Sequence, residues 1–325
     1  MPSPRVSFII PTHNRAGLLA GAVRSAARAG GEVDIIIIDD ASNDDTPHVC
    51  AALTQECSNV RVVRLERNVG LAQARNAGID ASTGEYLAFL DDDDLRLPDS
   101  LPAQIAALDA VPEAGLAYAP VELMDSGGRR LGQIQPQPAA CPSGDIFWEL
   151  LHENFMRVPS VVVRRSALDA VGPFRPGLRR VEDRDCWIRI TERCLAVVTL
   201  APVALYRQGD VASEQLSTDH PAMARTTAAL LEEWLKLPRA AAAHQAERDA
   251  VRHAFVELQL QLLISTAAQR LGLGLAAAAR RDLAAAWRIS PVRALKSRVP
   301  RLWLRSFLPL PKPPRAPRKP GVTAT

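Results

Sequence analysis

Four consecutive aspartates, at positions 91–94, come directly after the short apolar run of residues 86–90. The run predicts a buried strand, because it is apolar and follows the turn-forming pair Thr83-Gly84. If the chain stays extended past this run, Asp91 and Asp93 point to the same side, about 7 Å apart. Crowded carboxylates take up protons or gather a compensating cation, and divalent ions that prefer oxygen ligands suit such a cluster. We therefore predict a metal site; the alternative is a solvated acidic turn before a helix that starts near Leu97-Pro98.

The elements that would position these acids alternate along the first hundred residues. Apolar runs at residues 6–10, 33–38, 60–65 and 86–90 predict four strands, and the segments 16–29, 46–55 and 71–81 have helical spacing. Strands that are apolar on both faces, with helices between them, indicate a parallel sheet covered on both sides. We predict an α/β fold with a Rossmann-like, mostly parallel sheet covered by helices on both faces, followed by a C-terminal helical region.

Polar residues follow the predicted strands, at the edge where such sheets bind ligands. They are Pro11, Thr12, Asn14 and Arg15 after the first strand, Asp39 and Asp40 after the second, Asn68 and Gly70 after the third, and the aspartates after the fourth. This chemistry suits a nucleotide diphosphate, since carboxylates can accept hydrogen bonds from a ribose or a base, and Arg15 and Arg75 could balance phosphate charge. For Asp39-Asp40 the alternative is a turn and a helix cap before Thr46. For Arg75 it is a surface charge or an ion pair.

The usual glycine-rich phosphate loops are missing, because neither G-x-G-x-x-G after the first strand nor G-x-x-x-x-G-K-[ST] occurs. Phosphates are therefore expected to be held through metal. In order and spacing, five segments resemble the family 2 glycosyltransferases of GT-A fold: PTHNR at 11–15, DDAS at 39–42, NVGLAQARNAG at 68–78, TGEY at 83–86 and FLDDDD at 89–94. The resemblance covers about residues 5–207, and five segments in register make it specific.

This resemblance implies an inverting transfer of a sugar from a nucleotide diphosphate donor, usually uridine-linked, to a hydroxyl acceptor in cell-surface glycan or polysaccharide synthesis. It implies Mn²⁺ or Mg²⁺ bridging the diphosphate, where a divalent cation stabilises the charge of the leaving group. By position, Asp40 resembles the nucleoside-binding acid, and Asp91 and Asp93 the outer members of the D-x-D motif. The predicted metal ligands are Asp93 and Asp91, and the predicted nucleotide-sugar contacts are Pro11, Thr12, Asn14, Arg15, Asp39, Asp40, Asn68, Gly70, Arg75, Asp91, Asp92, Glu182 and Arg207.

Inversion by single displacement requires a general base on the opposite face of the sugar, and Glu182-Asp183 is the candidate. Trp187 and Ile190 follow at helical spacing, so the pair opens a helix. It resembles the family's Glu-Asp motif, whose aspartate is the base, and we predict that role for Asp183. The alternative is a helix cap. Arg207 resembles a position near the donor phosphates, although Gly209-Asp210 stands where the family usually has histidine.

The resemblance and the composition together predict three regions. The resemblance implies a GT-A domain at residues 1–210, with a donor-binding half at about 1–95 and an acceptor-binding half at about 96–210. Residues 211–308 are rich in alanine, leucine and arginine with helical periodicity, and residues 309–325 are a basic, proline-rich tail that we expect to be disordered. Five scattered cysteines without C-x-x-C, and no apolar stretch of ~18 residues, favour a cytoplasmic protein or one held peripherally at the inner membrane face.

The net charge of +3 is unevenly distributed, because ten Lys or Arg residues and no acidic residue follow Asp282, which leaves residues 1–282 at about −7. On a helix beginning at Ser290-Pro291, one side holds Val292, Leu295, Val299, Leu302 and Trp303, and it is bordered by Arg293, Lys296, Arg298, Arg301 and Arg305. Pro300 is expected to kink this helix. Such a segment suits the surface of an acidic bilayer, and the alternative is an ordinary docking helix with solvated arginines.

Two other functions compete with the transferase. A sugar nucleotidyltransferase would also use strand-end aspartates, but it predicts a glycine-rich basic loop that PTHNR at 11–15 does not supply. A non-catalytic nucleotide-sugar binder would be free to lose Asp93 or Asp183, and both are present. Nucleic acid is not expected as a partner, because the body is acidic and lacks aromatic residues clustered beside basic ones.

Overall fold

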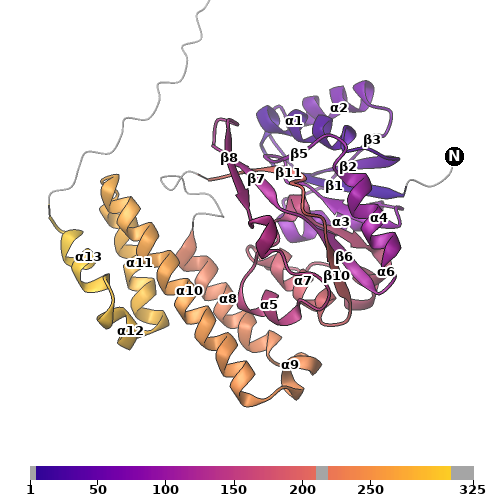
Figure 1. Ribbon diagram of the computed structural model, residues 1–325. Coiled ribbons are helices and arrows are strands. Elements are labelled where there is room, and N and C mark those ends of the chain that lie inside the picture. The colour runs from indigo at the N-terminus through magenta and orange to yellow at the C-terminus, as the bar shows by residue number, and fades with distance from the viewer. Residues whose placement is uncertain (1–4, 210–218, 309–325) are drawn as a thin grey trace, which may run out of the picture. The chain divides into compact units, whose positions relative to one another are not determined.

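The computed structural model describes residues 5–209 and 219–308 (Figure 1). The chain divides into two compact units. Unit 1 contains Met1–Gln208 and Leu230–Val251, and unit 2 contains Gly209–Ala229 and Arg252–Thr325. The predicted tail at 309–325 lies outside the described residues. A stretch of the C-terminal helical region, residues 230–251, thus packs into the same unit as the sheet.

The alternation predicted for the first ninety residues is confirmed. The elements are β1 (Val6–Thr12), α1 (Ala16–Ala27), β2 (Val33–Asp39), α2 (Thr46–Glu56), β3 (Val60–Arg64), α3 (Leu71–Ala81) and β4 (Tyr86–Phe89). All residues of β1 and β4 are buried, as expected for central strands with helices on both faces.

A seven-stranded sheet forms the centre of unit 1, in the order β10-β6-β9-β4-β1-β2-β3. β1 pairs in parallel with β2 and β4, and β2 pairs in parallel with β3. β6 (Ala114–Tyr118) and β10 (Leu195–Val198) are also parallel, and only β9 (Val162–Arg164) runs antiparallel to its neighbours. The mostly parallel sheet predicted from the sequence is therefore confirmed, with one reversed strand inserted at its centre.

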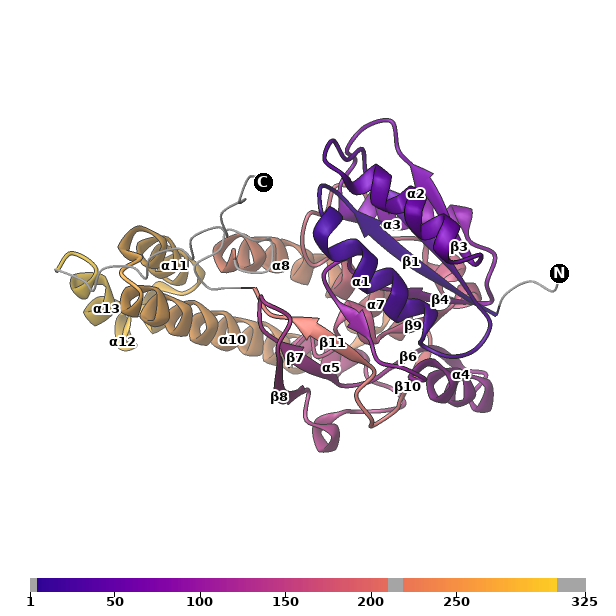
Figure 2. The ribbon, with the colours of Figure 1, turned by 90° about the horizontal axis from the view of Figure 1, so that it is seen from above.

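Each face of the sheet is covered by helices (Figures 1 and 2). On one face Phe8 and Ile10 share a core with α1, α2 and α4 (Leu101–Ala110). On the other face Ile9 meets α3, where Gly78 permits a close approach: a Cβ atom there would lie 2.3 Å from Ile9 Cγ2. This alternation follows from the two-residue period of a strand. The close approach of α3 to the sheet also explains why residue 78 is glycine, since any side chain there would push the helix off the sheet.

A second sheet of four short strands has the order β5-β11-β7-β8. Its members are β5 (Leu95–Arg96), β7 (Val121–Met124), β8 (Arg130–Gln135) and β11 (Ala204–Arg207). The apolar stretch at 197–205 is divided between β10 and β11, which belong to different sheets on either side of Pro202. Proline lacks a backbone donor, so it separates strands that apolar content alone would join.

The remaining elements of the described chain are helical. They are η1 (Pro138–Ala140), α5 (Phe147–His152), η2 (Val158–Ser160), α6 (Arg165–Val171), α7 (Glu182–Thr191), α8 (His220–Trp234), α9 (Pro238–Ala242), α10 (Gln245–Gly272), α11 (Ala276–Ile289), α12 (Pro291–Lys296) and α13 (Val299–Arg305). Within residues 5–209 and 219–308, no helix combines the length and the apolar character that crossing a bilayer requires.

The predicted kinked helix after Ser290 is instead two helices. α12 ends at Lys296, and α13 starts with Pro300 in its first turn, where proline is well tolerated. The apolar stripe expected along one side is divided as well. Val299 and Leu302 are buried in the core of unit 2, whereas Val292 and Leu295 are exposed, because the break between the helices rotates the second away from the register of the first.

Candidate active site at the carboxyl edge of the sheet

The four aspartates form a tight turn. β4 ends at Phe89, and the backbone N–H of Asp94 donates to the carbonyl oxygen of Asp91 at 3.1 Å. The extended geometry considered for this run is therefore wrong, because the chain reverses before Asp93. The turn separates the acids by burial. The side chains of Asp91 and Asp93 are 28% and 25% exposed, so these two can meet a ligand.

The other two aspartates face inward. Thr12 Oγ1 donates to Asp92 Oδ2 at 2.7 Å, and burial raises the pKa of Asp92 to about 7. Asp94 accepts the backbone N–H of Arg207 at 2.7 Å, and burial raises its pKa well above the usual range. Crowded carboxylates are expected either to take up protons or to gather cations, and both occur here. The buried pair, Asp92 and Asp94, favours protonation, whereas Asp91 and Asp93 contact cations.

Arginines supply those cations. Arg15, at the start of α1, pairs with Asp93 and lies 3.4 Å from Asp92. Arg207, at the end of β11, donates from Nε to the backbone carbonyl of Asp93 at 2.8 Å. The predicted phosphate contacts of Arg15 and Arg207 stay predictions; in the structure both side chains hold the acidic turn in place.

Arg75 joins the acidic turn to the Glu-Asp pair. Its side chain is only 1% exposed, and its two terminal nitrogens lie 2.6 Å from Asp91 Oδ1 and 2.6 Å from Glu182 Oε1. The guanidinium also lies over the ring of Phe174, 5.5 Å from its centroid. Of the two alternatives to phosphate binding, the ion pair is the one present. Arg75 thereby brings the end of β4 and the start of α7 to one place, although their acids are distant in the chain.

Asp183 is the accessible acid of α7. Glu182 and Asp185 are buried, whereas Asp183 is partly exposed and its only hydrogen bond among the described residues is a long one, 3.5 Å, from Asn154 Nδ2. α7 begins after Val181, and no side-chain hydrogen bond caps it. The capping alternative for Asp183 is thus not realised, and its carboxylate is left available to accept a proton.

The loops after β2 and β3 are tied together by Asp40. Its two carboxylate oxygens accept the backbone N–H groups of Val69 and Gly70 at 2.7 and 2.9 Å, and Asn68 Nδ2 reaches the Asp40 carbonyl at 3.4 Å. Gly70 has φ +85°, a conformation that favours glycine. Asp40 therefore shapes the rim where a nucleoside is predicted to bind.

Asp39 makes the turn contact of the alternative interpretation but not its helix cap, since α2 begins after Asp45 and has no side-chain cap. It accepts the backbone N–H of Ser42 at 2.9 Å and pairs with Arg64 at 2.9 Å, and it is 1% exposed. A direct contact with a ligand would need these partners to move.

The loop after β1 is held by hydrogen bonds to the loop after β2. Asn14, at φ +54°, receives a hydrogen bond on its side chain from the backbone N–H of Asn43 at 2.8 Å and donates its own N–H to Ser42 Oγ at 3.0 Å. Pro11 and Thr12 are buried beneath it. His13, not predicted to take part, lies 2.7 Å from the Asp40 carbonyl through Nδ1. The predicted contacts from residues 11–94 thus converge on one edge.

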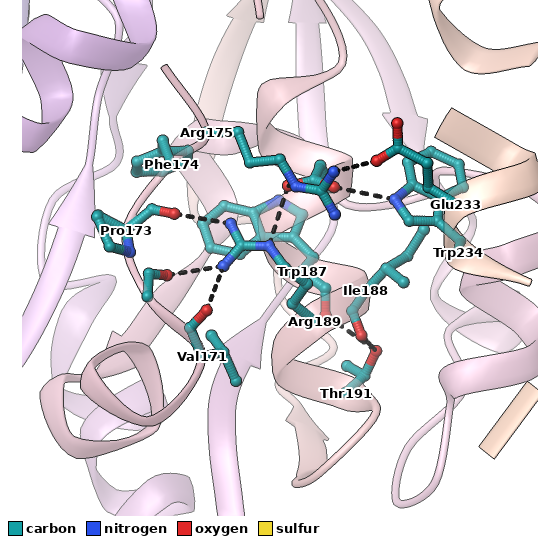
Figure 3. A network of polar contacts seen from close by, with 12 residues as sticks. Val171, Pro173, Phe174, Arg175, Trp187, Ile188, Arg189, Thr191, Glu233 and Trp234 are labelled. Carbon is teal, nitrogen blue, oxygen red and sulfur yellow. Dashed lines mark hydrogen bonds and ion pairs between the residues drawn. The ribbon is translucent and has the colours of Figure 1, made fainter. Parts of the chain in front are cut away.

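A buried network anchors the helix that carries Asp183 (Figure 3). Asp185 is fully buried, and its carboxylate accepts Trp234 Nε1 at 3.0 Å, Arg189 Nε at 3.0 Å and Arg175 Nε at 3.1 Å. Arg175 also pairs with Glu233. Arg189 donates to the carbonyl oxygens of Val171, Gly172 and Pro173, each at 2.8 Å. The network joins α7 to the loop before it and to the end of α8.

Removing the indole donor from this network should weaken unit 1. In Trp234→Phe the ring is kept but one buried oxygen of Asp185 loses its partner, and we expect a loss of about 1–3 kcal/mol in the free energy of unfolding. Chemical denaturation measures it. Trp148→Phe is the matched control, since its indole nitrogen has no described hydrogen bond, and equal losses in the two variants would contradict the assignment.

The network and Asn154 were missed in the sequence. The spacing of Asp185 and Arg189, four residues apart on a helix, was a visible signal for an ion pair. Nothing local pointed to Trp234 or Asn154, because both come from distant segments.

The donor set at the edge fits a hard divalent cation. The exposed carboxylates of the acidic turn are those of Asp91 and Asp93, and each supplies oxygen ligands of the kind that such an ion prefers. Among the described residues no three His, Cys, Asp or Glu side chains come together so as to hold a metal by themselves. The residues therefore fit an ion that takes one or two protein carboxylates and completes its shell with water and ligand phosphates, as Mg²⁺ commonly does.

The mostly parallel sheet with helices on both faces matches the GT-A fold of solved structures. Two solved structures share this fold. They are S. aureus TarS 1–349 in complex with UDP-GlcNAc (TM-score 0.62, 16% identity, 93% of this chain and 89% of that one) and the mannosyltransferase PcManGT from Pyrobaculum calidifontis in complex with GDP-Man and Mn²⁺ (TM-score 0.54, 18% identity, 90% of this chain and 87% of that one).

The sequence gives the family. Residues 7–179 match the profile of glycosyl transferase family 2, which is more than half of the chain. The protein belongs to this family. Among curated relatives, succinoglycan biosynthesis protein ExoO of Rhizobium meliloti is 34% identical over 191 residues, and an uncharacterized glycosyltransferase of Haemophilus influenzae is 27% identical over 194. The matches cover 55% and 58% of this chain, but only 53% and 62% of those proteins.

Proposed function

We propose that the protein transfers a sugar, with inversion, from a nucleotide diphosphate donor to a hydroxyl group of a growing polysaccharide or cell-surface glycan. The observation that carries this proposal is the buried bridge of Arg75 between Asp91 and Glu182, at 2.6 Å to each. The bridge brings the predicted donor-binding turn beside the predicted base. An inverting transfer needs these two functions next to each other, because the base must act on the face opposite the leaving group.

Asp183 is the proposed general base. It is the accessible acid at the start of α7, and Asn154, at 3.5 Å, can orient its carboxylate. Asp185 cannot take this role, since it is fully buried and its carboxylate accepts three hydrogen bonds or ion pairs. Asp183 would accept the proton of the acceptor hydroxyl as that oxygen attacks the anomeric carbon.

The loops after β1, β2 and β3 are proposed to hold the nucleotide, and the acidic turn the diphosphate. Asp93, with Asp91, would hold Mn²⁺ or Mg²⁺, which when bound neutralises charge on the leaving diphosphate. Arg15 pairs with Asp93. We propose that Arg15 turns to the phosphates when the donor and its cation arrive, because a cation on Asp93 and the guanidinium would repel each other.

The relatives support the donor and the pathway class. A TarS structure is in complex with UDP-GlcNAc, the PcManGT structure is in complex with GDP-Man and Mn²⁺, and ExoO is named for succinoglycan biosynthesis. We propose a UDP-sugar as the first donor to test. A nucleotidyltransferase reaction finds no support in the site, since the loop after β1 lacks the glycine-rich basic sequence that it would use.

A panel of nucleotide sugars tests the proposal by thermal shift. We expect one donor to raise the melting temperature only with Mn²⁺ or Mg²⁺, since ligands that bind the folded state stabilise it, and EDTA should abolish the rise. Asp93→Asn should remove the metal-dependent rise in melting temperature. Asp169→Asn is the matched control, as Asp169 is exposed on α6 and has no described partner. A shift that persists in EDTA would contradict a metal-bridged donor.

A further inference from the structure

Exposed apolar side chains gather at the end of the described chain. Nine large apolar residues of the described chain are at least 36% exposed, and five of them lie within residues 292–308. They are Val292 (65%), Leu295 (64%), Leu304 (70%), Phe307 (64%) and Leu308 (62%), all more exposed than any of the other four. Single exposed apolar residues are ordinary on protein surfaces, but a concentration of the most exposed ones is a feature of interaction sites.

These side chains are not a poorly packed core. α12 and α13 pack on α11 through other residues, and Ala294, Val299 and Leu302 are buried there. Phe307 is held at the surface by the ring of Trp303, at 6.1 Å, and by the guanidinium of Arg280, at 5.0 Å. Each short helix therefore has an inner face that is satisfied and an outer apolar face that is not covered within unit 2.

The same segment is strongly basic. Residues 283–308 contain six arginines and lysines and no acidic residue. Arg293 pairs with Glu257. Four others are exposed and have no acidic partner among the described residues: Lys296, Arg298, Arg301 and Arg305. We call the five exposed apolar residues and these four cations the basic-apolar surface.

We propose that the basic-apolar surface docks on an anionic lipid bilayer. A bilayer interface offers acidic headgroups to the cations and an acyl boundary to the aliphatic and aromatic side chains, which is the combination this surface matches. A nucleic acid would use the cations and leave Leu295, Leu304 and Leu308 in water. The proposal concerns where the enzyme works, and it stands independently of the donor and of the base.

The apolar area is small, because α12 and α13 have six and seven residues. Binding to the bilayer should therefore be reversible, and it should need both the apolar side chains and the cations of this surface, as for anchors that combine a modest apolar insertion with basic residues. It should weaken at high ionic strength, where exposed charges are screened within a few ångströms.

Vesicle flotation with the full chain tests the proposal. We expect the protein to float with vesicles of phosphatidylcholine containing phosphatidylglycerol, with at least ~10-fold weaker binding to phosphatidylcholine alone, and to be released when salt is raised from ~0.1 to ~1 M. Equal binding to both vesicles, no binding to either, or binding to single-stranded RNA but not to vesicles overturns the proposal.

Two double variants locate the contact. Arg301→Glu with Arg305→Glu removes cations, and Leu295→Ser with Leu304→Ser removes apolar groups. Each should lower vesicle binding at least ~5-fold while the melting temperature and the nucleotide-sugar shift stay unchanged. The matched control is Leu200→Ser with Lys236→Glu, which alters an exposed leucine and an exposed lysine of unit 1. Undiminished binding in both test variants would place the contact outside this surface and overturn the assignment.

Discussion

Replacing Asp183 by asparagine is expected to lower the turnover number by ~10³-fold and to leave nucleotide-sugar affinity unchanged. General bases contribute about 10²–10⁴ to enzymatic rates, and asparagine has the same shape but cannot take a proton at pH 7. The folded structure should be unaffected, because the only described partner of the Asp183 side chain is Asn154, at 3.5 Å. Initial rates at saturating donor and acceptor, with donor affinity from the thermal shift, make the comparison.

Two further variants separate a base from a general effect of charge. Asp169→Asn, on the surface of α6, should keep full turnover. Glu182→Gln should lower stability, since Glu182 is a buried partner of Arg75, and this sets it apart from Asp183→Asn. If Asp183→Asn retains more than about a tenth of the turnover, another group accepts the proton.

Replacing Arg75 by methionine is expected to cost about 3–5 kcal/mol in the free energy of unfolding. Methionine fills much of the volume but leaves Asp91 and Glu182 without the cation between them, and stranding a buried charge is among the most destabilising changes in proteins. Turnover should fall as well, because the acidic turn and the start of α7 lose their common partner. Denaturant unfolding measures the first effect and initial rates the second.

A double variant identifies the cause of that loss. Adding Glu182→Gln to Arg75→Met removes one stranded carboxylate, so the double variant should be more stable than Arg75→Met alone. Arg67→Met, at an exposed arginine of unit 1, controls for the loss of a positive charge. If the stability losses of Arg75→Met and Glu182→Gln simply add in the double variant, Arg75 acts through packing against Phe174 and not through its ion pairs with the acids.

The sequence predicted the first ninety residues well for a local reason. Each strand there is a short apolar run and each helix has its own apolar period. The secondary structure of segments such as Val33–Asp39 and Leu71–Ala81 can therefore be predicted without knowing their neighbours. The edge that collects the functional residues then follows from parallel topology. The failures come where local content is ambiguous: Pro202 divides one apolar stretch between two sheets, and the hydrogen bond from Asp94 to Asp91 closes a turn where alternation suggested a strand.

Partnerships across the chain were beyond sequence patterns. Arg75 meets acids 16 and 107 positions away, and its position on a helix predicts a surface cation as readily as a buried bridge. The contact between Asp183 and Asn154 likewise joins residues far apart in the chain and could not be predicted from the sequence. What the sequence supplied was the chemical type of each side chain, and only the tertiary arrangement shows which of those charges are already neutralised by the protein.

The packing of residues 230–251 into unit 1 has a practical corollary for exchange between relatives. The segment that matches the family profile stops at residue 179, yet the buried acid two positions after Asp183 is covered by an indole from Trp234. A chimera that transplants only the first 208 residues would carry every motif of the proposed donor site and expose that acid to water. Grafts should therefore transfer the α8–α9 junction together with the sheet, as one discontinuous module.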